Sequence, residues 1–201
     1  MKTLALFIVL SSILAVSAFA DTVNIVSDTT TQYYDDDLAA WQDSALAWVH
    51  GSWPSISGAN WIWSSYYVED PQYDELREFK KTFELPECSS YTGNIRITAD
   101  NIFTMYMNGQ KAGYDDNWQT VHNIDIGSFL NSGTNTFEFE VTNVGVLGYN
   151  AEQNPGAFIY SAEIECVQDF TEQSIAVPEF GTIAALVALA GAVTAFMVLR
   201  R

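Results

Sequence analysis

The sequence has few of the residues that most often carry catalysis and metal chemistry. Its 201 residues include only two cysteines and two histidines, His50 and His122. Neither histidine neighbours a cysteine, so no zinc-ligand spacing is present. The chain also has no Gly-x-Ser-x-Gly motif and no glycine-rich phosphate-binding loop. These absences predict a non-catalytic protein.

Basic residues are also scarce. The chain has eight lysines and arginines against 25 aspartates and glutamates. Without the two terminal segments described below, 24 acidic and five basic residues remain, a net charge of −19 for the body of the protein. This charge excludes nucleic acid and anionic lipid headgroups as partners of the body surface. It leaves calcium, ammonium-type solutes or a basic protein as partners, beside the simpler interpretation of an acidic coat that keeps an extracellular domain soluble.

The two ends of the chain predict export and anchoring. Lys2 precedes an apolar run, Leu4 to Val16, and Ser17-Ala18-Phe19-Ala20 ends in the small-residue pattern that signal peptidase cleaves, so residues 1–20 are predicted to be a signal peptide with a signal helix. At the other end, Thr182 to Leu199 is apolar throughout and is followed by Arg200-Arg201. Eighteen residues of helix span about 27 Å, just enough for a transmembrane helix. The basic end stays on the cytoplasmic side, which places the body outside the cell.

The tail, residues 177–201, also contains a short motif before the apolar run. Pro178, Glu179, Phe180 and Gly181, followed by one membrane helix and a basic end, resemble the PEF-CTERM class of archaeal sorting signals. The resemblance implies cleavage near the motif by an archaeosortase-type processing enzyme and transfer to a surface anchor. A permanent single-span anchor stays open as an alternative. A eukaryotic lipid-anchor signal fits less well, because such tails usually lack the terminal arginine pair.

The body between these segments has an all-β texture. Residues 21–168 are predicted to form one domain, and residues 169–176 a polar connector. Eight short β-branched, aromatic or alternating runs are separated by turn signals and indicate a β-sandwich: 23–26, 61–63, 78–85, 94–99, 102–107, 122–126, 136–141 and 157–165. Asn108-Gly109 predicts a tight hairpin between strands 102–107 and about 110–114. Residues 36–49 have mixed spacing and predict a short helix or an irregular loop.

The order of several motifs along the body resembles the galactose-binding-like jelly roll. These motifs are Trp61-Ile62-Trp63, Phe79-Lys80-Lys81-Thr82-Phe83, Ile97-Thr98-Ala99-Asp100-Asn101, Met105-Tyr106-Met107-Asn108-Gly109 and Gly127-Ser128-Phe129-Leu130-Asn131 with Gly133-Thr134-Asn135. The resemblance covers nearly the whole body and implies a jelly-roll β-sandwich, a module that accompanies many glycoside hydrolases as an accessory domain. Function does not follow from the fold, because the same sandwich serves as lectin, adhesion module and spacer.

Candidate ligand-binding residues lie in a loop-like stretch after the predicted hairpin. Trp118 follows Asp116 and Asn117, and Tyr114 lies just before them. An indole beside polar side chains offers a stacking face together with hydrogen-bonding partners for a sugar. Trp61 and Trp63 are better explained as large core fillers, with sugar stacking as the alternative.

Calcium is the cofactor that the acidic loops suggest, because hard cations bind carboxylate, amide and backbone oxygens in loops. The predicted ligands of one structural calcium are Asp100, Asn101 and Asp115, although no EF-hand spacing is present. A solvated acidic loop is the alternative.

The two cysteines, Cys88 and Cys166, predict one disulfide in an extracellular chain. Its closed loop of 77 residues would contribute about 4 kcal/mol to stability in the chain-entropy model.

These features together predict a secreted protein on the extracellular face of the cell membrane that binds envelope or extracellular carbohydrate without catalysis. The alternative is a structural, acidic envelope protein that packs against neighbouring surface proteins or concentrates cations. An enzyme that uses surface carboxylates is a third hypothesis.

Overall fold

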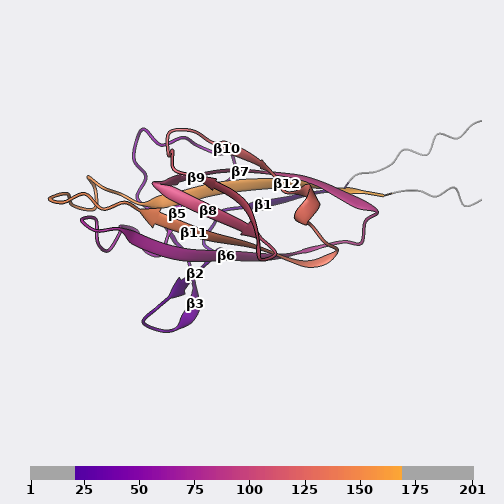
Figure 1. The fold of residues 1–201 in the computed structure, drawn as a ribbon, viewed down its shortest axis with the longest axis horizontal. Coiled ribbons are helices and arrows are strands. Elements are labelled where there is room, and N and C mark those ends of the chain that lie inside the picture. The colour runs from indigo at the N-terminus through magenta and orange to yellow at the C-terminus, as the bar shows by residue number, and fades with distance from the viewer. Residues whose placement is uncertain (1–20, 169–201) are drawn as a thin grey trace, which may run out of the picture. The chain divides into compact units, whose positions relative to one another are not determined.

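Residues 21–168 are described by the computed structural model (Figure 1). The predicted signal peptide, the connector and the tail with Pro178, Glu179, Phe180 and Gly181 lie outside the described residues. Within residues 21–168, the structure contains no helix long and apolar enough to cross a membrane.

Two antiparallel sheets of six strands each make up the body, which confirms the prediction of an all-β sandwich. The first sheet has the order β10-β7-β12-β5-β4, and β1 also pairs with β12. Its strands are β1 (Asp21–Val26), β4 (Ala45–Leu46), β5 (Ile62–Trp63), β7 (Ser90–Asp100), β10 (His122–Asp125) and β12 (Ala157–Val167).

The second sheet has the order β3-β2-β6-β11-β8-β9. Its strands are β2 (Gln32–Asp35), β3 (Ala40–Asp43), β6 (Glu75–Leu85), β8 (Ile102–Met107), β9 (Gln110–Asp115) and β11 (Gly133–Asn143). One 3-10 turn, η1 (Gly127–Phe129), precedes β11. All eight predicted strand runs are therefore present.

The core lies between the two sheets and is rich in aromatic rings. Phe79 on β6 meets Phe158 on β12 with 4.6 Å between ring centroids, and Phe139 on β11 meets Tyr160 on β12 at 4.8 Å. The alternation of β11 sends Phe139 inward and leaves its neighbour Glu138 exposed, as the sequence pattern predicts. Trp63 is fully buried and Trp61 nearly so, which confirms that both fill space in the protein interior.

Two turns show where the sequence pattern was informative and where it was not. Asn108 and Gly109 have positive φ values of 51° and 75° and join β8 to β9, as expected for a two-residue hairpin. The prediction of a helix or irregular loop at residues 36–49 is wrong, because β3 and β4 form there. Cross-strand contact between Tyr34 and Trp41, at 5.4 Å between centroids, favours the hairpin over a helix.

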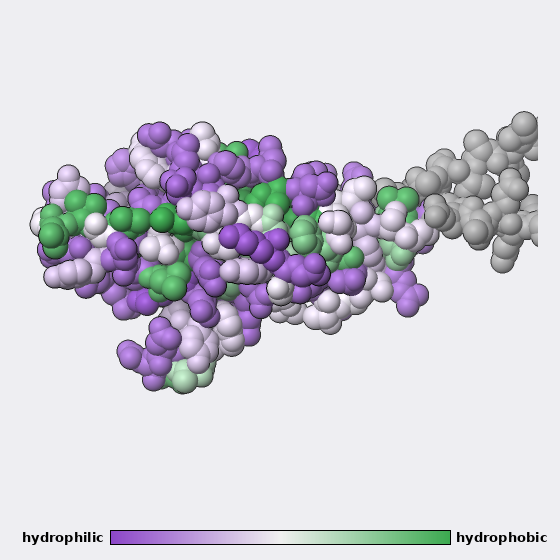
Figure 2. Space-filling view, viewed as in Figure 1, coloured by the Kyte–Doolittle hydropathy of each residue, from purple (hydrophilic) through white to green (hydrophobic). Residues whose placement is uncertain are grey.

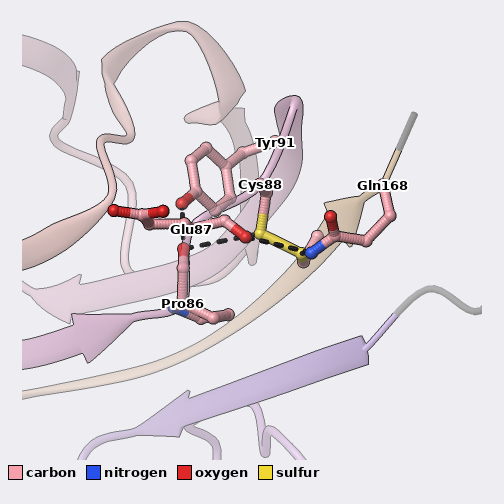
Figure 3. The surroundings of a disulfide bond; sticks show 6 residues. Pro86, Glu87, Cys88, Tyr91 and Gln168 are labelled. Atoms are coloured by element: carbon pink, nitrogen blue, oxygen red, sulfur yellow. Dashed lines mark hydrogen bonds between the residues drawn. A yellow bond between two sulfur atoms is a disulfide. The ribbon is translucent and has the colours of Figure 1, made fainter. Parts of the chain in front are cut away.

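The predicted disulfide is present between Cys88, in the β6–β7 connection, and Cys166, near the end of β12 (Figure 3). The Cα atoms are 5.6 Å apart. Gln168 donates from Nε2 to the carbonyl of Glu87 at 2.9 Å, and the Tyr91 hydroxyl donates to the carbonyl of Pro86. β1 begins beside the same bond, since Asp21 pairs with Cys166. Both ends of the described chain therefore lie at this disulfide end of the sandwich.

Candidate functional site

A pocket of about 190 Å³ lies where four connecting segments meet, at the end of β7 and before the start of β12. We call it the end pocket. Its lining residues come from the β4–β5 connection, the β7–β8 turn, the β9–β10 loop and the β11–β12 loop: His50, Trp53, Asp100, Asn101, Trp118, Gln153, Asn154 and Pro155. β7 and β12 run from this pocket to the disulfide, so the pocket lies at the opposite end of the sandwich from both ends of the described chain.

Asp100 is the charged group of the pocket interior. It is the last residue of β7 and is only 8% exposed. Its Oδ2 accepts a hydrogen bond from Trp53 Nε1 at 2.8 Å, and within residues 21–168 Asp100 forms no ion pair. Burial disfavours the ionised form and raises the pKa of Asp100 to about 6, although the Trp53 hydrogen bond lowers it. Asp100 is therefore a buried acceptor whose Oδ1 has no hydrogen-bond partner among the described residues.

Aromatic rings line the pocket beside this carboxylate. Trp53 packs against Trp61 with 4.3 Å between ring centroids, and the imidazole of His50 lies 6.4 Å from the ring of Trp53. Trp118 is partly buried against the core, and its carbonyl accepts a hydrogen bond from Thr98 Oγ1 at 3.2 Å. Because Thr98 belongs to β7, the strand that ends in Asp100 also fixes the loop that carries Trp118.

Amide side chains complete the wall and are partly engaged by the backbone. Asn101 Oδ1 accepts from the amide of Val144 at 2.6 Å, and Asn154 Nδ2 donates to the carbonyls of Pro71 and Val144 at 2.7 and 3.0 Å. These bonds fix both side chains. They leave Asn101 Nδ2 and Asn154 Oδ1 without a hydrogen bond inside residues 21–168, so each wall residue keeps one polar atom for a ligand.

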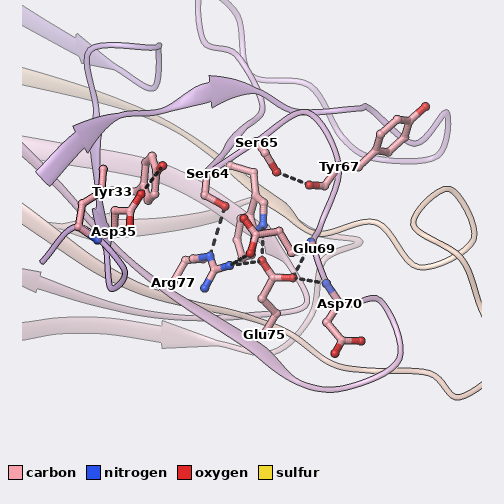
Figure 4. A network of polar contacts seen from close by, with 11 residues as sticks. Tyr33, Asp35, Ser64, Ser65, Tyr67, Glu69, Asp70, Glu75 and Arg77 are labelled. Carbon is pink, nitrogen blue, oxygen red and sulfur yellow. Dashed lines mark hydrogen bonds and ion pairs between the residues drawn. The ribbon is translucent and has the colours of Figure 1, made fainter. Parts of the chain in front are cut away.

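A buried polar network holds the loop that supports Asn154 (Figure 4). Glu75 is 6% exposed and accepts from Trp63 Nε1 at 3.0 Å and from the amides of Glu69 and Asp70 at 2.9 and 3.0 Å. Arg77 forms ion pairs with Glu75 at 3.1 Å and with Glu69 at 2.9 Å. The network fixes the loop just before Pro71, whose carbonyl accepts the hydrogen bonds of Asn154 Nδ2 and of the Val146 amide.

Three residues that were predicted from the sequence to serve two different sites, one for a sugar and one for calcium, lie in the same pocket. Trp118, predicted to bind a ligand, and Asp100 and Asn101, predicted to bind calcium, line the same pocket. Asp116, Asn117 and Tyr114 do not line it. Asn117 instead shapes its own loop by accepting from the amide of Gln119 at 3.1 Å, and Tyr114 is 54% exposed.

Two of the three predicted calcium ligands already contact protein groups. Asn101 Oδ1 is engaged by the Val144 amide, and Asp115 Oδ1 lies 3.0 Å from His122 Nε2. In the part of the chain that the structure describes, no group of three His, Cys, Asp or Glu side chains is placed to hold a metal ion. Calcium stays a prediction from the sequence.

Five further lining residues were not predicted as site residues: His50, Trp53, Gln153, Asn154 and Pro155. His50 and Trp53 stand in a tryptophan-rich loop, and Asn154 stands in a turn signal, Asn154-Pro155-Gly156. Nothing in the local sequence links these loops to Asp100. Their meeting depends on the pairing of β7 with β12, which is a long-range property of the fold.

Comparison with known proteins gives distant structural neighbours. No family model matches this chain, and no curated protein matches it in sequence. Among solved structures, a β-glucuronidase from Ruminococcus gnavus matches with a TM-score of 0.47, 12% identity and coverage of 72% of this chain and 29% of the enzyme.

Two rhamnosidases are also similar in structure. A family GH78 rhamnosidase from Bacillus sp. GL1 matches with a TM-score of 0.44, 29% identity and coverage of 56% of this chain and 12% of the enzyme. An α-L-rhamnosidase from Streptomyces avermitilis matches with a TM-score of 0.41, 24% identity and coverage of 58% and 12%. These neighbours are glycoside hydrolase chains, and this chain spans less than a third of each.

Proposed function

We propose that this protein is a non-catalytic carbohydrate-binding protein of the cell surface, with the end pocket as its binding site. The observation that carries the proposal is that Asp100, with one unused carboxylate oxygen, lines the same pocket as Trp53, which donates to it, and Trp118. Small-ligand sites typically combine aromatic walls with a few fixed polar groups. Pairs of sugar hydroxyls would donate to Asp100 and Asn154, while a ring face packs on the exposed part of Trp118.

The charge of the pocket selects against anionic sugars. Asp100 is buried, and the five basic residues of the body do not line the pocket. A uronate carboxylate would stand beside a second carboxylate without a lysine or arginine to compensate its charge, which is costly in a partly desolvated site. The expected ligand is therefore a neutral sugar unit, bound at a chain end because the pocket is small.

The pocket and the ends of the described chain lie at opposite ends of the sandwich. Both ends of the described chain lie at the disulfide end, and the pocket lies at the other end. In this proposal the protein is anchored through its C-terminal tail, after the archaeosortase-type processing that the PEF-CTERM resemblance implies. Within this proposal, the two sheets form a galactose-binding-like jelly roll that serves as a binding module.

The test is the affinity of the purified protein for neutral and uronate-containing oligosaccharides from cell envelopes, measured by calorimetry. We expect Trp118→Ala to weaken binding of the neutral oligosaccharide at least tenfold. Tyr114→Ala is the matched control, because Tyr114 is exposed and does not line the pocket. Equal affinity of the wild type and Trp118→Ala would remove the end pocket as the site. A repeat with a chelator tests the calcium hypothesis, since loss of affinity would require a metal.

One observation favours the alternative of a structural envelope protein. Large apolar side chains are exposed near the pocket end: Leu147 at 74% and Tyr73 at 66% on loops, and Leu76 at 52% at the start of β6. Figure 2 shows this end, on the left, with hydrophobic residues among mostly hydrophilic ones. Exposed apolar patches often mark protein contacts. Failure of all glycans to bind, together with concentration-dependent association of the protein, would favour this alternative.

A further inference from the structure

A second hollow lies on the outer face of the second sheet and shares no residue with the end pocket. It has a volume of about 260 Å³ and is lined by residues of β3, β6, β8 and β11 and by the β8–β9 turn: Trp41, Glu78, Phe79, Tyr106, Gly109, Glu138, Phe139 and Glu140. We call it the sheet groove. Trp41 belongs to the β2–β3 hairpin, which stands away from the rest of the sheet beside β6 (Figure 1).

The groove has aromatic walls and a carboxylate floor. Lys80 Nζ lies 4.0 Å from the centroid of the Trp41 ring, so the indole reaches over β6. Tyr106 stands on β8, two strands away, because β11 lies between β6 and β8. Neighbouring strands are about 4.8 Å apart, so the two walls stand over strands about 10 Å apart. Such a width suits one extended chain of sugar rings.

The floor concentrates negative charge without a compensating ion pair. Glu140 on β11 pairs directly with Glu78 on β6, and Glu138 is two residues along the same face. Like charges placed opposite each other destabilise a sheet. Within residues 21–168, none of these three carboxylates forms an ion pair. Glu140 accepts a hydrogen bond from the Tyr106 hydroxyl at 3.3 Å.

The Trp41 wall of the groove also suits a cation, apart from the charge of the floor. The ammonium group of Lys80 lies over the Trp41 ring rather than on the opposing Glu138, although these two residues pair directly across β6 and β11. This arrangement shows that the indole face accepts an ammonium group in a cation–π contact. A ligand that brings ammonium groups into the groove would gain from this kind of contact and from the unpaired carboxylates.

We propose that the sheet groove binds a glycan strand whose sugars carry protonated amino groups. The proposal goes beyond carbohydrate binding at the end pocket, because it concerns another surface and another ligand charge. The donor pattern favours a glycan over a basic peptide: the floor side chains offer acceptor oxygens, and sugar hydroxyl and ammonium groups are donors. A peptide backbone would also bring carbonyl acceptors, for which Glu78, Glu138 and Glu140 offer no donor.

The experiment compares three soluble probes on the purified full-length protein: a β-1,4-linked glucosamine oligomer, its fully N-acetylated counterpart and a lysine oligomer of equal charge. We expect the glucosamine oligomer to bind at least tenfold more tightly than either of the others, and Glu138→Gln with Glu140→Gln to weaken it at least tenfold. Trp41→Ala should weaken it as well.

The matched control is Glu163→Gln with Glu165→Gln, which removes the same charge from exposed positions of β12 on the other sheet. If both double variants lose the same affinity for the glucosamine oligomer, the binding depends only on the overall negative charge of the protein, and the proposal is overturned. Equal binding of the N-acetylated oligomer, or tighter binding of the lysine oligomer, would also overturn it. Trp118→Ala should leave glucosamine-oligomer binding unchanged; if it alone abolishes that binding, the end pocket and not the groove is the site.

Discussion

The two ends of the sandwich are held together by different physical means. The disulfide end is closed by a covalent bond between Cys88 and Cys166, where the described chain also begins and ends. The pocket end has long loops held by a buried carboxylate, Glu75, and by side chain to backbone hydrogen bonds. It also contains Asp100, a buried carboxylate with no ion-pair partner among the described residues. One end is therefore closed by a covalent bond, whereas the other is held by hydrogen bonds and keeps polar atoms that no described residue uses.

Removing the disulfide should produce the largest loss of stability without changing the pocket. Replacement of both cysteines, Cys88→Ser with Cys166→Ser, should lower the free energy of unfolding by about 4 kcal/mol, because the unfolded chain regains the entropy of a long loop. Urea denaturation measures the loss. Sugar affinity at a temperature where the variant is folded should be unchanged, and a simultaneous loss of affinity would contradict the separation of the two ends.

The next effect should come from Glu75→Gln, which removes the charge from the network at the pocket end. We expect a loss of about 3 kcal/mol, since Arg77 loses a buried partner and one of the acceptor oxygens becomes a donor. Unlike the cysteine variant, this one should also weaken sugar binding, because the loop that positions Asn154 is released. Glu69→Gln is the control: Glu69 is the exposed partner of Arg77 and should matter little. Unfolding curves and calorimetry on both variants decide this.

Asp100→Asn should have the opposite effect on stability. Burial raises the pKa of Asp100 from 3.8 to about 6, so ionisation costs the folded state about 3 kcal/mol above pH 6, and this cost disappears well below pH 4, where both states are protonated. Stability of the wild type relative to Asp100→Asn should therefore fall as pH rises from about 4 to 6. The variant should be more stable at pH 7 and bind sugar more weakly. A variant less stable than the wild type at pH 7 would show that the carboxylate serves the fold instead.

The smallest change in stability is expected for Trp118→Ala. The side chain is only partly buried, and the contact from Thr98 Oγ1 goes to the backbone carbonyl, which the substitution keeps. We expect a loss of about 1 kcal/mol in unfolding free energy and a tenfold or larger loss of affinity, which is about 1.4 kcal/mol. A thermal shift assay and calorimetry on the same sample separate the two effects.

The local sequence pattern was sufficient to predict most strands and the disulfide, but it did not predict the end pocket as one site. Alternation in residues 136–141 and the Asn108-Gly109 turn identify their elements because side-chain direction and backbone conformation are local properties. The β2–β3 hairpin was missed, since its aromatic pair, Tyr34 and Trp41, is recognisable only when the strands are paired. The end pocket was found only through Trp118, Asp100 and Asn101, in separate hypotheses, because the remaining wall residues come from loops far apart in sequence.

The pairing of β12 has a mechanical consequence. β12 runs eleven residues, about 37 Å, from the end pocket to Cys166, and it pairs with β7 along its whole length and with β1 over six residues. If the end pocket binds a ligand, as proposed, a pull between this ligand and the C-terminal side of the chain acts along this strand. Its interstrand hydrogen bonds would then be loaded in shear, many at once, instead of opening one after another. The disulfide between Cys166 and Cys88 also ties the C-terminal end of β12 to the β6–β7 connection, so β12 cannot be peeled off its neighbours starting from that end.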